Sequence, residues 1–153
     1  MLDGAAVKPG SIVVDLGAGS GLVGVAAAAR GATVFFTDVS PALLDDCRRN
    51  VAAVSPTQPR YFIETSADDL SPLDDEIADA VTARPVLIYV ADRHRVLDES
   101  FRVLRPGGRL SVLEPLNSFW GTPRSGDFCG YDLSAVASLS HWQRGVQASR
   151  QWT

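Results

Sequence analysis

A glycine-rich stretch near the start of the chain has the residue types needed to bind a ligand through its backbone. Residues 15–21 read Asp-Leu-Gly-Ala-Gly-Ser-Gly, with glycine at Gly17, Gly19 and Gly21. Glycine allows a tight turn and lets a ligand approach the backbone without a Cβ in the way. The stretch therefore predicts a ligand-binding loop, with a merely tight turn as the alternative.

A second acidic residue points to the kind of ligand. Asp38 ends the apolar run at residues 32–38, about twenty residues beyond the glycines. A carboxylate at this place can accept hydrogen bonds from both hydroxyls of a ribose. The alternative is capping of the next helix, for which Ser40 is the stronger candidate. Loop and acid together predict a nucleoside-binding site.

The elements that must position these residues alternate along the chain. Apolar and β-branched runs predict strands at 11–16, 32–38, 61–64, 79–83 and 109–114, and helical spacing predicts helices at 21–30, 42–54 and 92–104. In the last helix we expect Val96, Leu97, Phe101 and Leu104 to share one apolar face. Such alternation predicts a parallel sheet with helices on both faces, which binds ligands at the carboxyl ends of its strands.

Two cofactor families fit the loop. Residues 19–24 match the dinucleotide fingerprint, and Asp38 would suit NAD, so an NAD-binding Rossmann oxidoreductase domain is one alternative. The dinucleotide fingerprint would start at Gly19, two residues after Gly17, where the turn already begins. The pattern that begins at Asp15 instead resembles motif I of class I S-adenosylmethionine-dependent methyltransferases. The resemblance extends over residues 7–115.

The resemblance implies a fold and a cofactor. The fold is α/β, a Rossmann-like doubly wound and mostly parallel sheet of strand order 3-2-1-4-5, and the cofactor is S-adenosyl-L-methionine. The positions it assigns to the cofactor are Asp15, Gly17, Ala18, Gly19, Ser20 and Gly21 in the loop, Asp38 and Val39 after strand two, Ser66, Ala67 and Asp68 after strand three, and Ala83 and Arg84 after strand four.

In the family, the loop surrounds the methionine part of the cofactor, and Asp38 matches the acid that binds the ribose. Residues 66–70 look like the segment that contacts adenine; many relatives carry an acid where Ser66 stands, and Asp68 is the substitute here. Residues 101–110 resemble the helix–turn–strand signature of small-molecule methyltransferases. The resemblance thus implies methyl transfer to a small-molecule acceptor.

No residue is assigned a catalytic role. Methyl transfer from a sulfonium is an in-line displacement that alignment and desolvation can accelerate, so a general base is optional. His94 is interpreted as a solvated helix residue, and His141, in the tail, is not favoured as a base. Tyr89 is interpreted as a core residue, with a position facing the transferred methyl group as the alternative. Glu114, which ends strand five, is a candidate border of the acceptor pocket.

Composition narrows the partners. The net charge is −4, Lys8 is the single lysine, and residues 68–79 are strongly acidic, so a nucleic-acid partner is disfavoured. The Asn/Asp-Pro-Pro-Tyr motif of nucleic-acid amino-methylating relatives is absent at residues 83–85. Cys47 and Cys129 lack metal-type spacing, so we expect two reduced thiols and no metal.

We expect a single domain over residues 1–153, located in the cytoplasm, because no leader or membrane-length apolar run is visible. Two family features look absent: the helices before motif I and the antiparallel strand pair after strand five. Residues 118–153 are rich in Gly, Ser and Arg, with only a weak helical pattern at 132–139 and partial disorder as an alternative.

Three interpretations remain open for a sheet that lacks its edge strands. The chain is an active minimal enzyme that needs a partner subunit, for example a second copy, to close the pocket. The exposed strand five would invite such pairing. Alternatively, it is a truncated product that binds the cofactor without turnover. The third interpretation is a non-catalytic binding or regulatory module.

Overall fold

The computed structural model describes residues 1–54, 58–115, 127–128 and 131–132. The chain divides into two compact units, residues 1–115 and residues 116–153. The first unit carries all the predicted cofactor positions. In the second unit, two short strands, β6 (Asp127–Phe128) and β7 (Tyr131–Asp132), pair antiparallel. Most of the region predicted as the tail, including the helical pattern at 132–139, lies outside the described residues.

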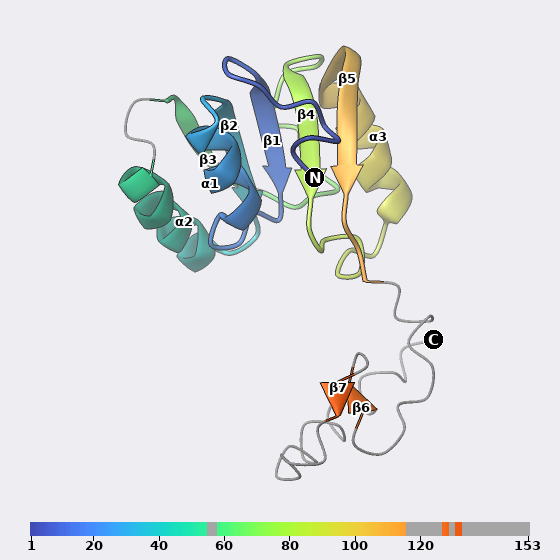
Figure 1. Cartoon of the computed structure of the whole chain (residues 1–153). Coiled ribbons are helices and arrows are strands. Elements are labelled where there is room, and N and C mark those ends of the chain that lie inside the picture. The colour runs from blue at the N-terminus through green and yellow to red at the C-terminus, as the bar shows by residue number, and fades with distance from the viewer. Residues whose placement is uncertain (55–57, 116–126, 129–130, 133–153) are drawn as a thin grey trace. The chain divides into compact units, whose positions relative to one another are not determined.

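A five-stranded parallel sheet forms the centre of the first unit (Figure 1). Its strands are β1 (Ile12–Leu16), β2 (Thr33–Asp38), β3 (Arg60–Glu64), β4 (Ala78–Ala83) and β5 (Leu104–Val112). They lie in the order β3-β2-β1-β4-β5, and every neighbouring pair is parallel. The α/β fold and the strand order 3-2-1-4-5 are therefore confirmed.

Three helices cover the sheet: α1 (Leu22–Ala29), α2 (Pro41–Val54) and α3 (Arg93–Val103). Helices α1 and α2 lie on one face, whereas α3 lies on the other, beside β5 (Figure 1). The predicted cap of α2 is present, because the Leu43 amide donates to Ser40 Oγ over 3.4 Å. Asp92 caps α3 by accepting from the Arg95 amide over 3.0 Å. Both helices thus begin at the edge of the sheet that is formed by the carboxyl ends of the strands.

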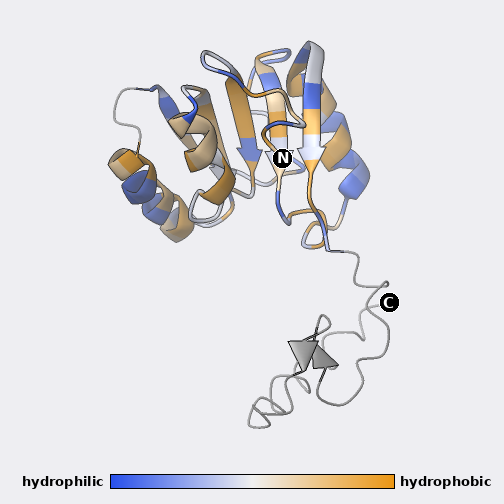
Figure 2. Cartoon of the chain, viewed as in Figure 1, coloured by the Kyte–Doolittle hydropathy of each residue, from blue (hydrophilic) through white to orange (hydrophobic). Residues whose placement is uncertain are grey.

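The central strand β1 is buried on both faces, which explains its continuous apolar run. Val13 packs in the cluster formed with α1 and α2, whereas Val14 and Leu16 pack in the cluster on the α3 side. Figure 2 shows β1 hydrophobic over most of its length and hydrophilic near its carboxyl end. The polar residue near that end of β1 is Asp15.

The predicted apolar face of α3 is wrong in part. The residues that pack against the sheet are Val96, Ser100 and Val103, whereas Leu97 is 43% exposed and Phe101 is 82% exposed. Ser100 is small enough for close packing, and its hydroxyl donates to the Val96 carbonyl over 2.7 Å, so the buried polar group is satisfied. Helical spacing fits either face, and tertiary packing selected the one with the smaller residue.

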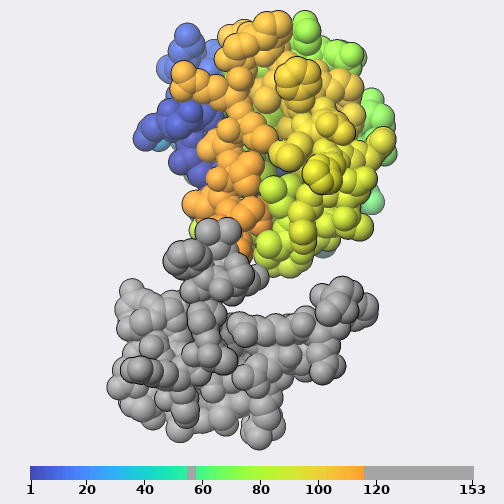
Figure 3. All heavy atoms as spheres, turned by 90° about the vertical axis from the view of Figure 1, so that its right-hand side faces the viewer, coloured from blue at the N-terminus to red at the C-terminus, as the bar shows by residue number. Residues whose placement is uncertain are grey.

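Strand β5 begins earlier than predicted and contains a bulge. Ala78 pairs with Leu104 but Ala80 pairs with Arg109, so the four residues 105–108 of β5 lie opposite the single residue Asp79 of β4. Gly107 in this bulge has φ +81°, a conformation that favours glycine. Among the described residues no strand pairs with the outer side of β5, which Figure 3 shows between the N-terminal segment and α3.

The segment before β1, residues 1–11, forms turns. Leu2, Ala5 and Val7 are nevertheless buried and join the core on the α1 side. In the described part of the chain, no helix is both long and apolar enough to cross a membrane.

Candidate cofactor-binding site

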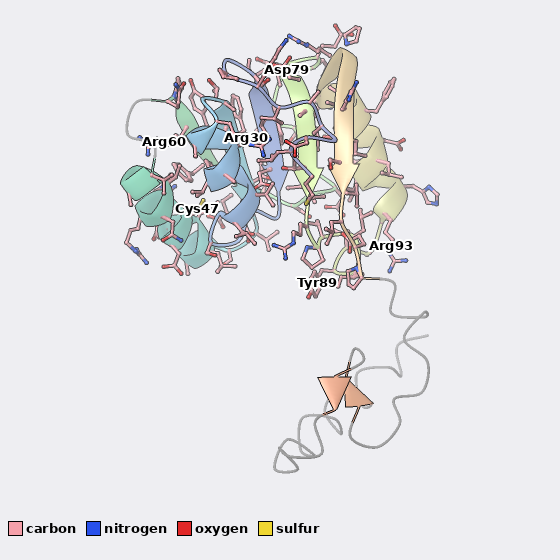
Figure 4. All side chains as sticks on the ribbon, in the orientation of Figure 1. Arg30, Cys47, Arg60, Asp79, Tyr89 and Arg93 are labelled. Atoms are coloured by element: carbon pink, nitrogen blue, oxygen red, sulfur yellow. The ribbon has the colours of Figure 1, made fainter. Side chains whose placement is uncertain are left out.

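Because the strands are parallel, the segments that follow β1, β2, β3 and β4 emerge at one edge of the sheet. The predicted cofactor positions all lie in or beside these segments. Figure 4 shows Tyr89 and Arg93 at this edge, whereas Asp79 lies at the opposite edge. The topology therefore gathers residues that are up to 69 positions apart, from Asp15 to Arg84, along the carboxyl edge.

The three loop glycines serve different purposes. Gly17, Gly19 and Gly21 all have positive φ, of 55°, 56° and 96°. A Cβ on Gly17 would lie 2.7 Å from Val86 Cγ2, and one on Gly21 would lie 2.7 Å from Cys47 Sγ. A Cβ on Gly19 would meet nothing within 4 Å. Packing thus requires two of the glycines, whereas Gly19 faces open space from which a ligand can approach.

The Asp15 carboxylate holds the base of the loop together. It is 2% exposed, Oδ2 accepts from the Gly24 amide over 2.8 Å, and Oδ1 accepts from Thr82 Oγ1 over 2.7 Å. Burial raises the pKa of Asp15 to about 6, against the lowering effect of the bonds from Thr82 and Gly24. Asp15 is therefore bound on both oxygens and joins β1 to α1 and β4.

Thr82 is a residue that the sequence interpretation missed. It lies on β4 directly opposite Asp15 in the parallel register, and its side chain is fully buried. A threonine in a run of alanine and valine is an ordinary strand residue by type. Only the pairing of β4 with β1 shows that its hydroxyl meets a buried carboxylate.

Asp38 ties the loop to the end of β2. Its side chain is 8% exposed, Oδ2 accepts from the Gly19 amide over 2.8 Å, and Oδ1 accepts from the Ser40 amide over 2.9 Å. A carboxylate has about four acceptor positions, and the described residues occupy two of them. Val39, the next residue, is 68% exposed, which places a large apolar side chain beside them.

The segment after β3 is joined to the end of β2 and to α3. The Thr65 amide donates to the Asp38 carbonyl over 3.1 Å. Ser66 Oγ hydrogen bonds to Asp68 Oδ1, and Arg95 Nε donates to the Asp68 carbonyl over 2.8 Å. Ser66 and Asp68 thus lie together, and Ala67 between them is buried.

The segment after β4 contains Ala83, which is buried, and Arg84, which is exposed. The Ala83 carbonyl accepts from the Leu113 amide over 3.0 Å, which extends the β4–β5 pairing. Tyr89 is 78% exposed, so its placement in the core is wrong. A turn closed by the bond from the Tyr89 amide to the Val86 carbonyl, over 2.9 Å, carries the ring outward.

Beside this segment lies an open depression of about 400 Å³. Its lining is mixed, with six apolar and three charged residues: Met1, Leu2, Leu22, Val23, Ala26 and Leu113, and Asp3, Arg30 and Arg84. Leu22 begins α1 immediately after the glycine loop, and Arg84 and Leu113 follow β4 and β5. The depression therefore adjoins the carboxyl edge of the sheet on the α1 side.

The remaining reactive side chains have ordinary surroundings. His94 is exposed on α3, as interpreted from the sequence, and His141 lies outside the described residues. Cys47 is a buried free thiol, and burial raises its pKa to about 12, which keeps it protonated. Cys129 is also outside the described part. Within that part, no cluster of His, Cys, Asp or Glu could hold a metal ion.

Residues 14–112 match a family described as a methyltransferase domain. The chain is 40% identical over 111 residues to demethylmenaquinone methyltransferase of Clavibacter sepedonicus, covering 71% of this chain and 44% of that protein. It is 33% identical over 101 residues to tRNA 5-carboxymethoxyuridine methyltransferase of Escherichia coli K12, covering 66% of this chain and 39% of that protein. The chain thus spans less than half the length of either relative.

Solved structures agree with the sequence relatives. The arsenic(III) S-adenosylmethionine methyltransferase of Chlamydomonas reinhardtii aligns with a TM-score of 0.64 at 31% identity, over 71% of this chain and 39% of that one. The YcgJ protein of Bacillus subtilis shares the fold, with a TM-score of 0.66 at 23% identity over 74% of this chain and 48% of that one. With the family match covering more than half of its residues, the chain belongs to the class I S-adenosylmethionine-dependent methyltransferases.

Proposed function

We propose that this chain binds S-adenosylmethionine at the carboxyl ends of β1, β2 and β4 and transfers its methyl group to a small-molecule acceptor by in-line displacement. The observation that carries the proposal is the contact between Gly19 and Asp38. The backbone beside Gly19 is open, and the Asp38 carboxylate that accepts its amide has acceptor positions that no described residue occupies, which suits a ribose. When bound, the cofactor supplies an electrophilic methyl group on a sulfonium.

Each part of the edge has a role in the proposal. The loop residues Gly17–Gly21 adjoin the methionine part, and Asp38 binds the ribose hydroxyls. Val39 and residues 66–68 flank the adenine, and the segment at Ala83 and Arg84 lies beside the sulfur. The contribution of these residues is to bind, orient and exclude water, which suffices for a displacement that needs no obligatory base.

The acceptor proposal rests on the depression next to the glycine loop. Leu22, Val23 and Leu113 can bury apolar surface of a ligand, and the charged Arg84 can contact a polar group. This mixed lining favours a small molecule that has both apolar and polar parts. The net charge of −4 and the single lysine disfavour RNA, although one relative is named for a tRNA substrate. We also propose a cytoplasmic location. In addition, we propose that the exposed β5 edge pairs with a second copy of the chain, and the molar mass in solution would show whether a dimer forms.

The first test is a calorimetric titration of the purified chain with S-adenosylhomocysteine, with NAD as a parallel ligand. We expect saturable heat with S-adenosylhomocysteine alone. Heat with NAD alone would overturn the proposal in favour of the oxidoreductase alternative. Silence with both ligands would favour a domain that does not bind the cofactor.

Two variants locate the binding in the same experiment. Asp38→Ala is expected to abolish detectable binding, because it removes the ribose acceptor and releases the Gly19 amide. Gly19→Val is expected to block the approach of the cofactor, since its side chain would occupy the open space. Circular dichroism confirms that each variant is folded, and wild-type affinity in either would refute its assigned role.

A further inference from the structure

Glu114, which follows β5, bonds to a loop that belongs to another strand. Its Oε1 accepts from the Val86 amide over 2.6 Å and from the Leu87 amide over 2.7 Å. Two hydrogen bonds from backbone amides to one carboxylate oxygen are charge-assisted and stronger than neutral ones. Its Oε2 is buried and accepts no hydrogen bond from a described residue. Within the described residues, the hydrogen bonds of this carboxylate thus both come from the loop between β4 and α3.

That loop is packed against the glycine loop through Val86. Val86 is 6% exposed, and its Cγ2 lies 2.7 Å from the position that a Cβ on Gly17 would take. Its methyl group therefore rests directly over the Gly17 backbone. If Val86 moved away, the backbone at Gly17 would lose the side chain that packs against it. The contacts form a chain from β5 through the loop after β4 to the loop after β1.

We propose that Glu114 is a positioning residue for cofactor binding, which holds Val86 against Gly17 and so keeps the glycine loop in its binding conformation. The inference rests on the proposed cofactor site and assigns Glu114 no contact with the cofactor. Glu114 affects the affinity for the cofactor, because ordering a loop upon binding costs part of the binding free energy. A loop that is already held in place avoids this cost. A carboxylate suits the task because two adjacent amides need one strong acceptor.

Three substitutions separate the hydrogen bonds from the charge. Glu114→Ala removes the acceptor and leaves the amides of Val86 and Leu87 without it. Glu114→Gln is neutral but keeps a carbonyl oxygen that can accept from both amides. Val86→Ala shortens the side chain over Gly17 and leaves the bonds in place. Asp98→Ala, which removes an exposed carboxylate from α3, is the matched control for charge.

The first measurement is the affinity for S-adenosylhomocysteine. We expect Glu114→Ala to weaken it about tenfold, or about 1.4 kcal/mol, whereas Glu114→Gln and Asp98→Ala stay within about twofold of the wild type. If Glu114 acts through Val86, the effects of Glu114→Ala and Val86→Ala do not add in the double variant. Wild-type affinity in Glu114→Ala, equal losses in Ala and Gln variants, or additive effects would each overturn the inference.

The second measurement needs no ligand and keeps the inference separate from the proposed function. Hydrogen exchange at the amides of Ala18 and Gly19 is expected to speed up in Glu114→Ala and to stay unchanged in Glu114→Gln. Unchanged exchange in Glu114→Ala would refute the positioning role even if the wild type bound no cofactor. If Glu114→Ala does not fold, Glu114→Asp, which is one methylene shorter, takes its place with the same expected and contrary results.

Discussion

The glycine loop and the segment after β3 adjoin the same proposed cofactor, yet they are held by different kinds of contact. The glycine loop is fixed by buried carboxylates: Asp15 binds Gly24 and Thr82, and Asp38 binds Gly19. These partners lie on β1, α1, β4 and β2, so four elements meet at one short loop.

The segment after β3 is held by long side chains from α3. Arg102 donates to the carbonyls of Leu70 and Leu73 and pairs with Glu99 and Asp75. The Arg102 side chain is 27% exposed and that of Asp75 is 73% exposed. The hydrogen bonds with Glu99 and Asp75 raise the pKa of Arg102, and the hydrogen bond from Arg102 lowers the pKa of Glu99.

The difference predicts different mechanical behaviour. A buried carboxylate is costly unless its oxygens are bonded, so the arrangement around Asp15 tolerates little change. Exposed ion pairs contribute about 1 kcal/mol or less and are screened by salt. We therefore expect a rigid site for the methionine and ribose parts beside a more adjustable site for the adenine.

The largest effect is expected for Gly24→Val in α1. A Cβ there would lie 2.3 Å from Phe36 Cε1 and 2.9 Å from Asp15 Oδ2, both in the rigid region. We expect a loss of about 3 kcal/mol or more in unfolding free energy, because the core cannot move aside. Chemical denaturation measures it, with Ala29→Val, at an exposed position of the same helix, as the matched control. Equal losses in the two variants would show that valine in this helix, and not the contact with Phe36, determines the effect.

The next effect concerns pH and Asp15. Its pKa is raised from 3.8 to about 6, so the folded chain holds this proton more tightly than the unfolded chain. The contribution of Asp15 to the unfolding free energy therefore falls as pH rises from about 4 to about 6 and stays low above that. Asp15→Asn keeps a carbonyl oxygen that can accept from the Gly24 amide, and its side-chain NH2 group can donate to Thr82 Oγ1. Unlike the carboxyl group, this amide does not titrate.

We expect the unfolding free energy of Asp15→Asn, relative to wild type, to rise by up to roughly 3 kcal/mol across this interval. Urea denaturation of both proteins at a series of pH values measures the difference. A difference that stays constant with pH would mean that Asp15 is not buried as a charged group, and would weaken the contrast between the two regions.

A smaller effect is expected for Arg102→Ala in the adjustable region. The variant loses the bonds to Leu70 and Leu73, and we expect a cost of about 1–2 kcal/mol that shrinks in high salt. Arg49→Ala, which breaks the exposed pair with Asp46, is the control and should cost about 0.5 kcal/mol or less. Thermal unfolding at low and high salt gives both values; a salt-independent loss of about 3 kcal/mol in Arg102→Ala would make this region as rigid as the other.

The smallest effect tests the corrected face of α3. Phe101 is 82% exposed, so Phe101→Ser should change the unfolding free energy by about 0.5 kcal/mol or less. Val96→Ala, on the buried side of the same helix, should cost about 2 kcal/mol and serves as the contrast. A large loss in Phe101→Ser would mean that another surface covers this ring.

Much of the fold could be predicted because local signals agree with one another. The run of apolar residues in β1 and Ser40 before α2 each have a local cause, and each is present. The positions of Tyr89 and of Phe101 were not predictable in this way. An aromatic side chain next to a turn or on a helix fits the core or the surface equally well until the packing partners are known.

The sequence by itself determined the α/β class, the strand order by way of the family resemblance, and the cofactor edge, because glycine spacing and acids at strand ends are local properties of the chain. Only the tertiary structure decided that Thr82 meets Asp15, that Gly19 alone among the loop glycines faces open space, and that Glu114 bonds to the loop at Val86. These contacts join residues 28 to 67 positions apart. Their geometry depends on strand register and side-chain packing, which no local pattern encodes.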